Sequence, residues 1–357
     1  MARSIAQIEA LLKQSAAEAG FDLAGIAPAR LSDSRELRFF SDWIAGGRAG
    51  DMAYLESRDG QGRLRRAALE HVAPWARSVI VCALNYNTAH HRSAECRDPE
   101  RGWVSRYAWG ATDYHDVVME RLRRVEARLR SEVGDPAIET RCYVDTGPVV
   151  ERVFAAYAGV GWIGKNTCLI NQQTGSWLFL GVILTSLELA PDLPAPDRCG
   201  SCTSCLDACP TQAFVAAREL DATRCISYLT IEKRGAIPEE LRPGMGNHVF
   251  GCDICQDVCP WNRRAPTSSA PEFEPHPERF NPALAWLTSL SDDDFRAAFG
   301  GSPIRRARRS GLRRNALVAM GNSGQHSFVP LLQQLARDPD PVVAEHAEWA
   351  LRKIGNL

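Results

Sequence analysis

The sequence predicts an α+β protein of three successive parts, and three observations support this. Helical and strand-like stretches alternate from residue 1 to about 195, two cysteine-rich runs follow between 196 and 265, and a polar linker leads into a helical repeat at 266–357. With 357 residues and 45% hydrophobic content, the chain is long enough for two or three domains with sizeable cores. We therefore expect domains at 1–195, 196–265 and 266–357.

The first part combines strands and helices. The runs "RSVIVCALNY", "TRCYVDTG" and "SWLFLGVILT" are strand-like, whereas "DVVMERLRRVEARLRSEV" has helical spacing. The opening residues form an amphipathic helix that Gly20 caps, rather than the hydrophobic region of a signal peptide. The most apolar run, "WLFLGVILTSLEL", is too short to span a bilayer. We therefore expect a cytoplasmic monomer that does not bind membranes.

The second part carries clustered cysteines. "CGSCTSCLDACPT" fits the C-x2-C-x2-C-x3-C-P pattern, in which three cysteines bind one [4Fe–4S] cluster and the fourth reaches another. "GCDICQDVCPWN" supplies a second set, and a further cysteine lies upstream of it in "TRCISYLT". Crosswise ligation then assigns one cluster to Cys199, Cys202, Cys205 and Cys259, and the other to Cys209, Cys225, Cys252 and Cys255.

Zinc is the alternative for these cysteines, because paired C-x2-C knuckles are also typical of zinc sites. Zinc gives no reason for two Cys-Pro endings in a crosswise arrangement, and a reducing cytoplasm disfavours disulfides. Two [4Fe–4S] clusters are therefore the hypothesis, and they require an external electron donor.

The third part repeats itself at an offset of thirty-four residues. "NALVAMGN" from Asn315 matches "WALRKIGN" from Trp349, which is typical of a HEAT-like helical repeat. The net charge of −1 gives no general attraction to nucleic acid. Six arginines in "RRARRSGLRR" are nevertheless either a solvated helix face or a binding surface for RNA phosphates. These candidates for tRNA binding are Arg305, Arg306, Arg308, Arg309, Arg313 and Arg314.

The segment "GVGWIGKN" at 159–166 satisfies two phosphate-binding patterns, G-x-G-x-x-G and G-x4-G-K. Neither fits its context, because a helical pattern precedes it and Asn166 replaces the Ser or Thr that binds magnesium. We interpret the glycines as a tight turn beneath a large flat ligand, with Trp162 as an apolar wall and Lys165 as a polar contact.

The motifs together resemble one family. "YAWGATDYHDVV", "VDTGPVVERVFAAYAGVGWIGKNTCLI", the two cysteine runs and the helical tail are similar to those of epoxyqueuosine reductases, in the same order and over nearly the whole chain. The resemblance implies an oxidoreductase of queuosine biosynthesis that reduces epoxyqueuosine at the wobble position of tRNA. It also implies a cobalamin-binding α/β domain, a ferredoxin-like module with two [4Fe–4S] clusters, and a HEAT-like tail.

The resemblance also implies roles for single residues. Asp145 of "VDTG" would be the catalytic proton donor. The motif positions near cobalamin are Asp113, Tyr114, His115, Arg152, Trp162, Lys165 and Asn166. Iron–sulfur clusters pass single electrons and do not open carbon–oxygen bonds themselves, so a second cofactor such as cobalamin is required.

Three rival functions share part of this pattern. A reductive dehalogenase would use the same cofactors, but it usually carries a twin-arginine leader and needs no basic tail. A ferredoxin-like carrier would leave nearly two hundred N-terminal residues unexplained. An RNA-binding protein with structural clusters would bind no corrinoid.

Overall fold

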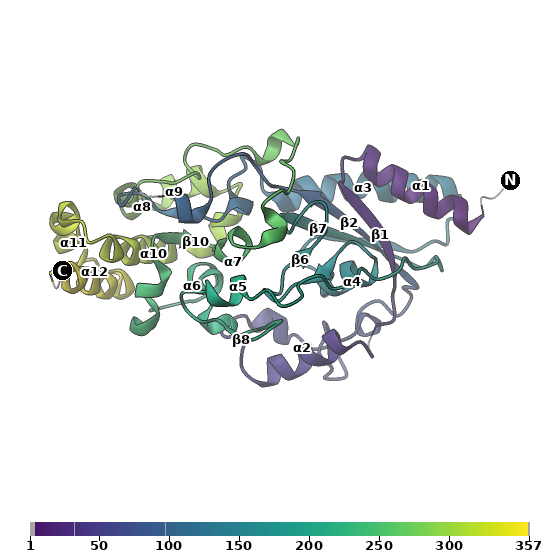
Figure 1. Ribbon diagram of the computed structural model, residues 1–357, viewed down its shortest axis with the longest axis horizontal. Helices are drawn as coiled ribbons and strands as arrows, with labels where there is room; N and C mark the ends of the chain where they lie inside the picture. Colours follow the sequence, from purple (N-terminus) through teal and green to yellow (C-terminus); the bar gives the residue numbers. More distant parts are fainter. Residues whose placement is uncertain (1–3, 32, 97, 356–357) are drawn as a thin grey trace. The chain divides into compact units, whose positions relative to one another are not determined.

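An antiparallel sheet forms the centre of the first part of the fold (Figure 1). The predicted strands are confirmed, and a fourth precedes them near the N-terminus. In spatial order they are β1 (Leu23–Pro28), β2 (Ser78–Asn85), β7 (Leu178–Thr185) and β4 (Thr140–Tyr143). The apolar side chains of β2 are buried at every position, so this strand has no polar face.

Helices cover both faces of this sheet. On one face, Val153 and Phe154 of α4 (Glu151–Tyr157) pack in a core with Val81 and Val182, which are register partners in β2 and β7. On the other face, Gly181 lies beneath Leu122 of α3 (Tyr114–Val133), and a Cβ at Gly181 would lie 2.6 Å from the Leu122 Cδ1 atom. Successive side chains of a strand point to opposite faces of the sheet, so each strand packs against a helical layer on both sides.

The predicted N-terminal helix is confirmed as α1 (Ile5–Glu18). Ser4 and Gln7 form a capping box at its start, which satisfies two backbone N–H groups. Gly20 follows the helix at φ +88°, and its carbonyl accepts a hydrogen bond from Arg121 of α3 at 2.8 Å. The remaining elements of this part are α2 (Arg35–Ala45) and the hairpin of β5 (Trp162–Ile163) and β6 (Leu169–Ile170).

The rest of the chain is mainly helical. Two short parallel strands, β3 (Trp103–Val104) and β10 (His248–Phe250), pair with each other. The cysteine runs carry α5 (Ser204–Asp207), the hairpin of β8 (Phe214–Ala216) and β9 (Glu219–Leu220), α6 (Ile226–Ile231) and α7 (Ile254–Asp257). The C-terminal helices are α8 (Leu284–Ser289), α9 (Asp292–Phe299), α10 (Arg308–Ser323), α11 (Val329–Leu335) and α12 (Pro341–Gly355).

The glycine of the sequence repeat has a packing role in this tail. A Cβ at Gly321 of α10 would lie 2.6 Å from the Trp349 ring and 3.0 Å from the Ala350 Cα atom of α12. Glycine therefore lets the two helices approach closely. The helical character of the tail is confirmed, and its HEAT-like arrangement stays a prediction.

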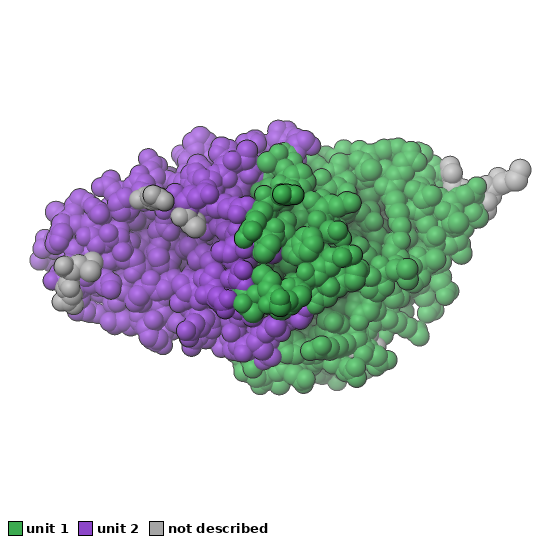
Figure 2. All heavy atoms as spheres, viewed as in Figure 1, with its two compact units in different colours: residues 1–87, 115–203, 260–268 green, residues 88–114, 204–259, 269–357 purple. Residues whose placement is uncertain are grey.

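The computed structural model describes residues 4–31, 33–96 and 98–355. The chain forms two compact units, each made of three segments (Figure 2). The first unit contains 1–87, 115–203 and 260–268, and the second contains 88–114, 204–259 and 269–357. These interleaved units differ from the three consecutive segments expected from the sequence. Within the described residues, no helix is long and apolar enough to cross a membrane.

Candidate active site

Three of the predicted cluster cysteines interact electrostatically within the second unit. Burial is the main cause that raises the pKa of Cys252 well above its usual value, and the neighbouring Cys225 and Cys209 thiols raise it further. Burial likewise raises the pKa of Cys225, with Cys209 adding to the effect. Cys209 comes from the first cysteine run but interacts with cysteines outside it. Thiolates at these buried positions need a metal to hold their charge.

Two short helices each position one cysteine of a run. Cys205 lies on α5 and Cys255 on α7, and these helices pack against each other within the second unit. Each helix ends just before a Cys-Pro pair, because proline cannot continue the hydrogen-bond ladder. Cys259 is buried after α7. Cys199 and Cys202 belong to the first unit, so the four cysteines assigned to the first cluster are divided between the units.

The "GVGWIGKN" segment holds the first two cysteines in place. Trp162 donates a hydrogen bond from Nε1 to the Cys199 Sγ atom at 3.4 Å. The Lys165 ammonium donates to the carbonyls of Gly200 and Cys202, at 2.8 Å each. Lys165 was expected to contact a ligand, but its observed partners are the backbone of the cysteine segment.

The other residues expected near a flat ligand differ in their exposure and in what they contact. Asn166 is buried and its side-chain oxygen accepts from the Cys168 N–H at 3.2 Å, so it closes its own turn. Arg152 is exposed and donates to the Thr167 carbonyl at 3.1 Å. Trp162 lines a cavity of about 330 Å³ in the first unit, together with Gly161, Asn171, Gln172, Gln173, Ala195, Pro196 and Arg198.

The "TDYH" motif contributes to both units. In the second unit, Asp113 is buried and interacts electrostatically with Arg279, whose guanidinium donates to the Gly110 carbonyl. Tyr114 contacts Tyr107 edge-on, with ring centroids 5.8 Å apart. His115 belongs to the first unit, where it lies in the first turn of α3.

Asp145, the expected proton donor, lies two residues after the end of β4 in the first unit. Its φ of +55° is in the left-handed region, which Asp tolerates better than most residues. The loop turns tightly because the next glycine lacks a side chain: a Cβ at Gly147 would lie 2.5 Å from the Tyr143 ring. The Asp145 side chain is 60% exposed, and its Oδ2 atom lies 3.5 Å from Nε2 of His115. The carboxyl is therefore accessible to a substrate.

A second carboxyl, Glu151, was missed by sequence reasoning. It is the first residue of α4, and its Oε1 atom is shielded from solvent with no hydrogen-bond partner among the described residues. Burial, with the Asp145 charge adding to it, raises the pKa of Glu151 to about 7, against the opposing effects of its own backbone N–H, Arg66 and Arg152. Its signal in the sequence was only a glutamate six residues after Asp145.

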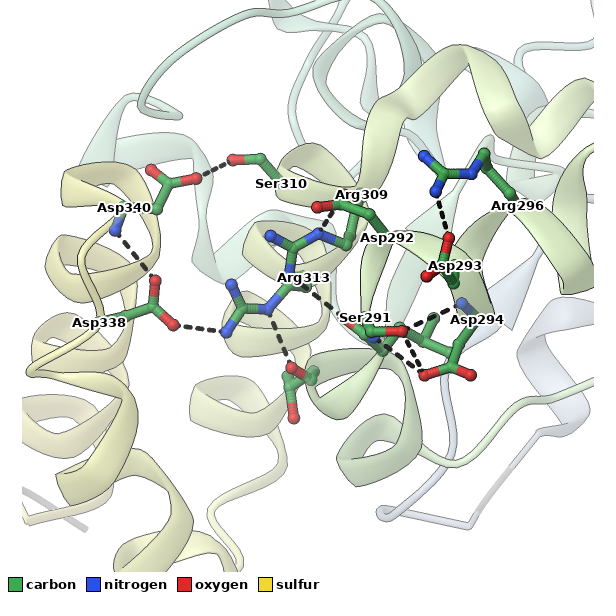
Figure 3. A network of polar contacts seen from close by, with 12 residues as sticks. Ser291, Asp292, Asp293, Asp294, Arg296, Arg309, Ser310, Arg313, Asp338 and Asp340 are labelled. Atoms are coloured by element: carbon green, nitrogen blue, oxygen red, sulfur yellow. Dashed lines mark hydrogen bonds and ion pairs between the residues drawn. The ribbon is translucent and has the colours of Figure 1, made fainter.

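The six arginines of the tail separate into two groups. Arg313 and Arg314 are buried, and Arg309 is half-buried. Figure 3 shows Arg309 paired with Asp292, at 2.7 Å between Nε and Oδ1, and Arg313 paired with Asp338, at 2.6 Å between Nη2 and Oδ2. Arg314 donates to the carbonyls of Leu229, Lys233 and Gly235.

The remaining arginines of this segment face outward. Arg306 pairs with Glu232 at 2.5 Å between Nε and Oε1, but it is partly exposed. Arg305 and Arg308 are exposed, and in the part of the chain described here neither side chain has a hydrogen-bond or ion-pair partner. Arg313 and Arg314 stabilise the fold and do not face solvent, so they are no longer candidates for RNA binding. The other four arginines stay candidates.

The chain is similar to known proteins over nearly its whole length. Residues 198–262 match a 4Fe-4S double cluster binding domain, and residues 66–146 match a family described as epoxyqueuosine reductase QueG, DUF1730. The chain is 42% identical to an epoxyqueuosine reductase of Pseudomonas aeruginosa, covering 98% of this chain and 95% of that protein. It is 36% identical to the Escherichia coli epoxyqueuosine reductase, with 97% and 89% coverage.

Solved structures agree with these sequence matches. A crystal structure of selenomethionine-labelled epoxyqueuosine reductase superimposes with a TM-score of 0.88 at 35% identity, covering 98% of this chain and 91% of that chain. A structure of epoxyqueuosine reductase with an epoxyqueuosine-modified tRNA-Tyr stem loop gives 0.87 at 35% identity, with 99% and 91% coverage. A Bacillus subtilis epoxyqueuosine reductase, with its catalytic loop swung out of the active site, gives 0.87 at 34% identity and 98% and 91% coverage.

Proposed function

The chain belongs to the epoxyqueuosine reductase family, and from that premise we propose that it uses cobalamin, supplied with electrons by two [4Fe–4S] clusters, to act on tRNA. Membership makes it an oxidoreductase of queuosine biosynthesis that converts epoxyqueuosine to queuosine. The cofactor, the residue roles and the RNA contacts are the parts that we propose.

The neighbourhood of Cys209, Cys225 and Cys252 is the observation that carries the electron-transfer part. A cysteine from the first run interacts electrostatically with cysteines of the second set, which supports crosswise ligation of two [4Fe–4S] clusters. Cys255 completes this set on α7. We assign Cys199, Cys202, Cys205 and Cys259 to the other cluster. An external donor would deliver electrons one at a time.

Cobalamin is proposed because iron–sulfur clusters alone do not break the carbon–oxygen bond of an epoxide. When bound, reduced cobalamin supplies a reactive centre for breaking a carbon–oxygen bond, which single-electron carriers do not provide. The fit to this chain rests on the β5–β6 hairpin. A Cβ at Gly161 would lie 2.4 Å from the Ile170 carbonyl oxygen, so the hairpin packs tightly and Trp162 forms part of a cavity wall.

Particular residues would hold the corrinoid. Trp162 would give apolar contact, and the exposed Arg152 has donors left for amide side chains of the ligand. His115, Asp113 and Tyr114 stay candidates from the motif. Lys165 and Asn166 would act indirectly, because Lys165 holds the cysteine segment and Asn166 holds its own turn.

Asp145 would act as the general acid. Its carboxyl is accessible, lies at the end of a strand and has His115 beside it. Opening an epoxide produces an alkoxide, which needs a proton from a group within hydrogen-bond reach. Closure of a cofactor over this carboxyl would desolvate it and favour its protonated form.

Arg305, Arg306 and Arg308, with Arg309 at the edge, would contact tRNA phosphates. A family member 35% identical to this chain has been solved with a modified tRNA stem loop. Guanidinium groups that face solvent attract phosphates without reading bases. We further propose that the protein is a cytoplasmic monomer.

The crosswise ligation can be tested with matched cysteine variants. Cys209→Ala should damage the cluster of Cys225 and Cys252, whereas Cys259→Ala should damage the cluster of Cys199. Iron analysis and quantitative spin counting under anaerobic conditions identify which cluster is lost. Loss of the Cys199 cluster in Cys209→Ala would contradict the assignment and would favour two clusters ligated each within its own run.

A further inference from the structure

The reduction needs more protons than one carboxyl holds. Removing the epoxide oxygen leaves a carbon–carbon double bond and releases the oxygen as water, so each turnover consumes two electrons and two protons. The clusters and their donor supply the electrons. If Asp145 is the proton donor, as the proposed function holds, it must be recharged within one turnover. The first unit should therefore contain a second group that carries a proton at neutral pH.

We propose that Glu151 is the proton reservoir of this site and that its protonated carboxyl recharges Asp145. In the transfer, the O–H bond of the Glu151 carboxyl breaks and a new O–H bond forms on the Asp145 carboxylate. Glu151 becomes the anion, and solvent then returns a proton to it. Glu151 acts through Asp145 and so is a positioning and proton-storing residue rather than one that touches the substrate.

Location is the first argument for this role. Glu151 begins α4 and interacts electrostatically with Asp145, while its Oε1 atom is shielded and has no hydrogen-bond partner among the described residues. An unsatisfied buried carboxyl oxygen is costly, so an isolated structural role would favour another side chain. The half-buried side chain still leaves a route for protons from solvent.

Charge is the second argument. The groups that act on Glu151 are the Asp145 carboxyl, its own backbone N–H and the Arg66 and Arg152 guanidiniums, and His115 lies beyond Asp145. Burial and the Asp145 charge together raise the pKa of Glu151 to about 7, despite both arginines. A neighbouring negative charge disfavours ionisation of a carboxyl. Glu151 is shielded from solvent, so burial and the Asp145 charge both favour its protonated form.

The pH dependence of turnover distinguishes a proton-storing role of Glu151 from a purely structural one. The test uses holoenzyme with both clusters and cobalamin, comparing wild type, Glu151→Gln, Glu151→Asp and the exposed control Glu188→Gln. In single-turnover assays, Glu151→Gln should be at least about 10-fold slower near pH 7.5 and within about twofold of wild type near pH 5.5, where solvent recharges Asp145. Glu151→Asp should retain most of the rate, and Glu188→Gln should match wild type.

A second readout does not depend on activity. Infrared difference spectra of the cofactor-free protein should show a protonated carboxyl band that titrates near pH 7 and is missing in Glu151→Gln. Equal slowing of Glu151→Gln at every pH, no slowing at all, or absence of the band in wild type would overturn the proposal. Failure of the proposed function is a separate result, because wild-type holoenzyme would then form no queuosine or Asp145→Asn would be fully active.

Discussion

Arg314 offers a quantitative test of the division between structural and RNA-binding arginines. The side chain is 1% exposed and makes five hydrogen bonds, three to the carbonyls of Leu229, Lys233 and Gly235 and two to the Asn315 side-chain oxygen. Arg314→Met keeps much of the side-chain volume and removes every donor. The substitution therefore measures what the guanidinium contributes to the fold.

The magnitude follows from two opposing effects. The variant leaves four acceptors without donors: the buried Leu229 carbonyl and Asn315 side-chain oxygen, and the partly buried carbonyls of Lys233 and Gly235. At about 1.5 kcal/mol for each acceptor, the loss is about 6 kcal/mol. Burial lowers the pKa of Arg314 from 12.5 to about 10. At about 1.36 kcal/mol per pKa unit, burying the charge costs the folded protein about 3 kcal/mol, and the uncharged variant avoids this cost. We expect Arg314→Met to lower the free energy of unfolding by about 3 kcal/mol.

Urea unfolding of the anaerobic protein, followed by tryptophan fluorescence, measures this change. Arg305→Met is the matched control, because its exposed side chain should alter stability by less than about 0.5 kcal/mol. The salt dependence of tRNA affinity should show the reverse pattern, with a flatter slope for Arg305→Met and an unchanged slope for folded Arg314→Met. A stable Arg314→Met protein with a flatter slope would refute the division.

Three further predictions concern the first unit. Asp145→Asn should bind both clusters yet turn over about 10²–10⁴-fold more slowly in single-turnover assays, and near-normal product formation would exclude Asp145 as the acid. Trp162→Phe removes the N–H donor to Cys199 and should lower the reduction potential of that cluster in an electron-paramagnetic-resonance redox titration, whereas an unchanged potential would contradict the contact. Glu151 has a raised pKa in the folded state, so its contribution is present below about pH 4.5 and is lost as the pH rises through about 7. Wild type should therefore lose about 3 kcal/mol of stability relative to Glu151→Gln across this range. If the unfolding free energies of the two proteins changed with pH in parallel, the pKa of Glu151 would not be raised by folding.

Local chemistry made part of this protein predictable from its sequence. The cysteine spacing indicated the clusters because each cubane needs four thiolates at close range, and continuous apolar runs indicated strands β2 and β7 because both faces of the sheet are covered. Gly20, which follows α1 at a left-handed φ, likewise has a local reason.

Long-range packing explains what the sequence did not predict. Arg313 and Arg314 look like a basic surface in the sequence, but carbonyls and an aspartate distant in sequence surround them in the fold. Lys165 follows a phosphate-binding pattern, yet it binds carbonyls of the cysteine segment. Glu151 becomes unusual only because folding shields it next to Asp145. The interleaving of the two units also depends on pairings that no local pattern encodes.

The most direct test of the central claim is a single-turnover measurement of queuosine formed per enzyme, with and without cobalamin. Enzyme with both clusters is reduced anaerobically, freed of excess reductant and mixed with tRNA carrying epoxyqueuosine, and the nucleosides are then quantified by mass spectrometry. We predict about one queuosine per bound cobalamin, and none from cobalamin-free enzyme even though its reduced clusters store electrons. Equal yields from the two preparations would contradict the account, because the clusters alone would then reduce the epoxide.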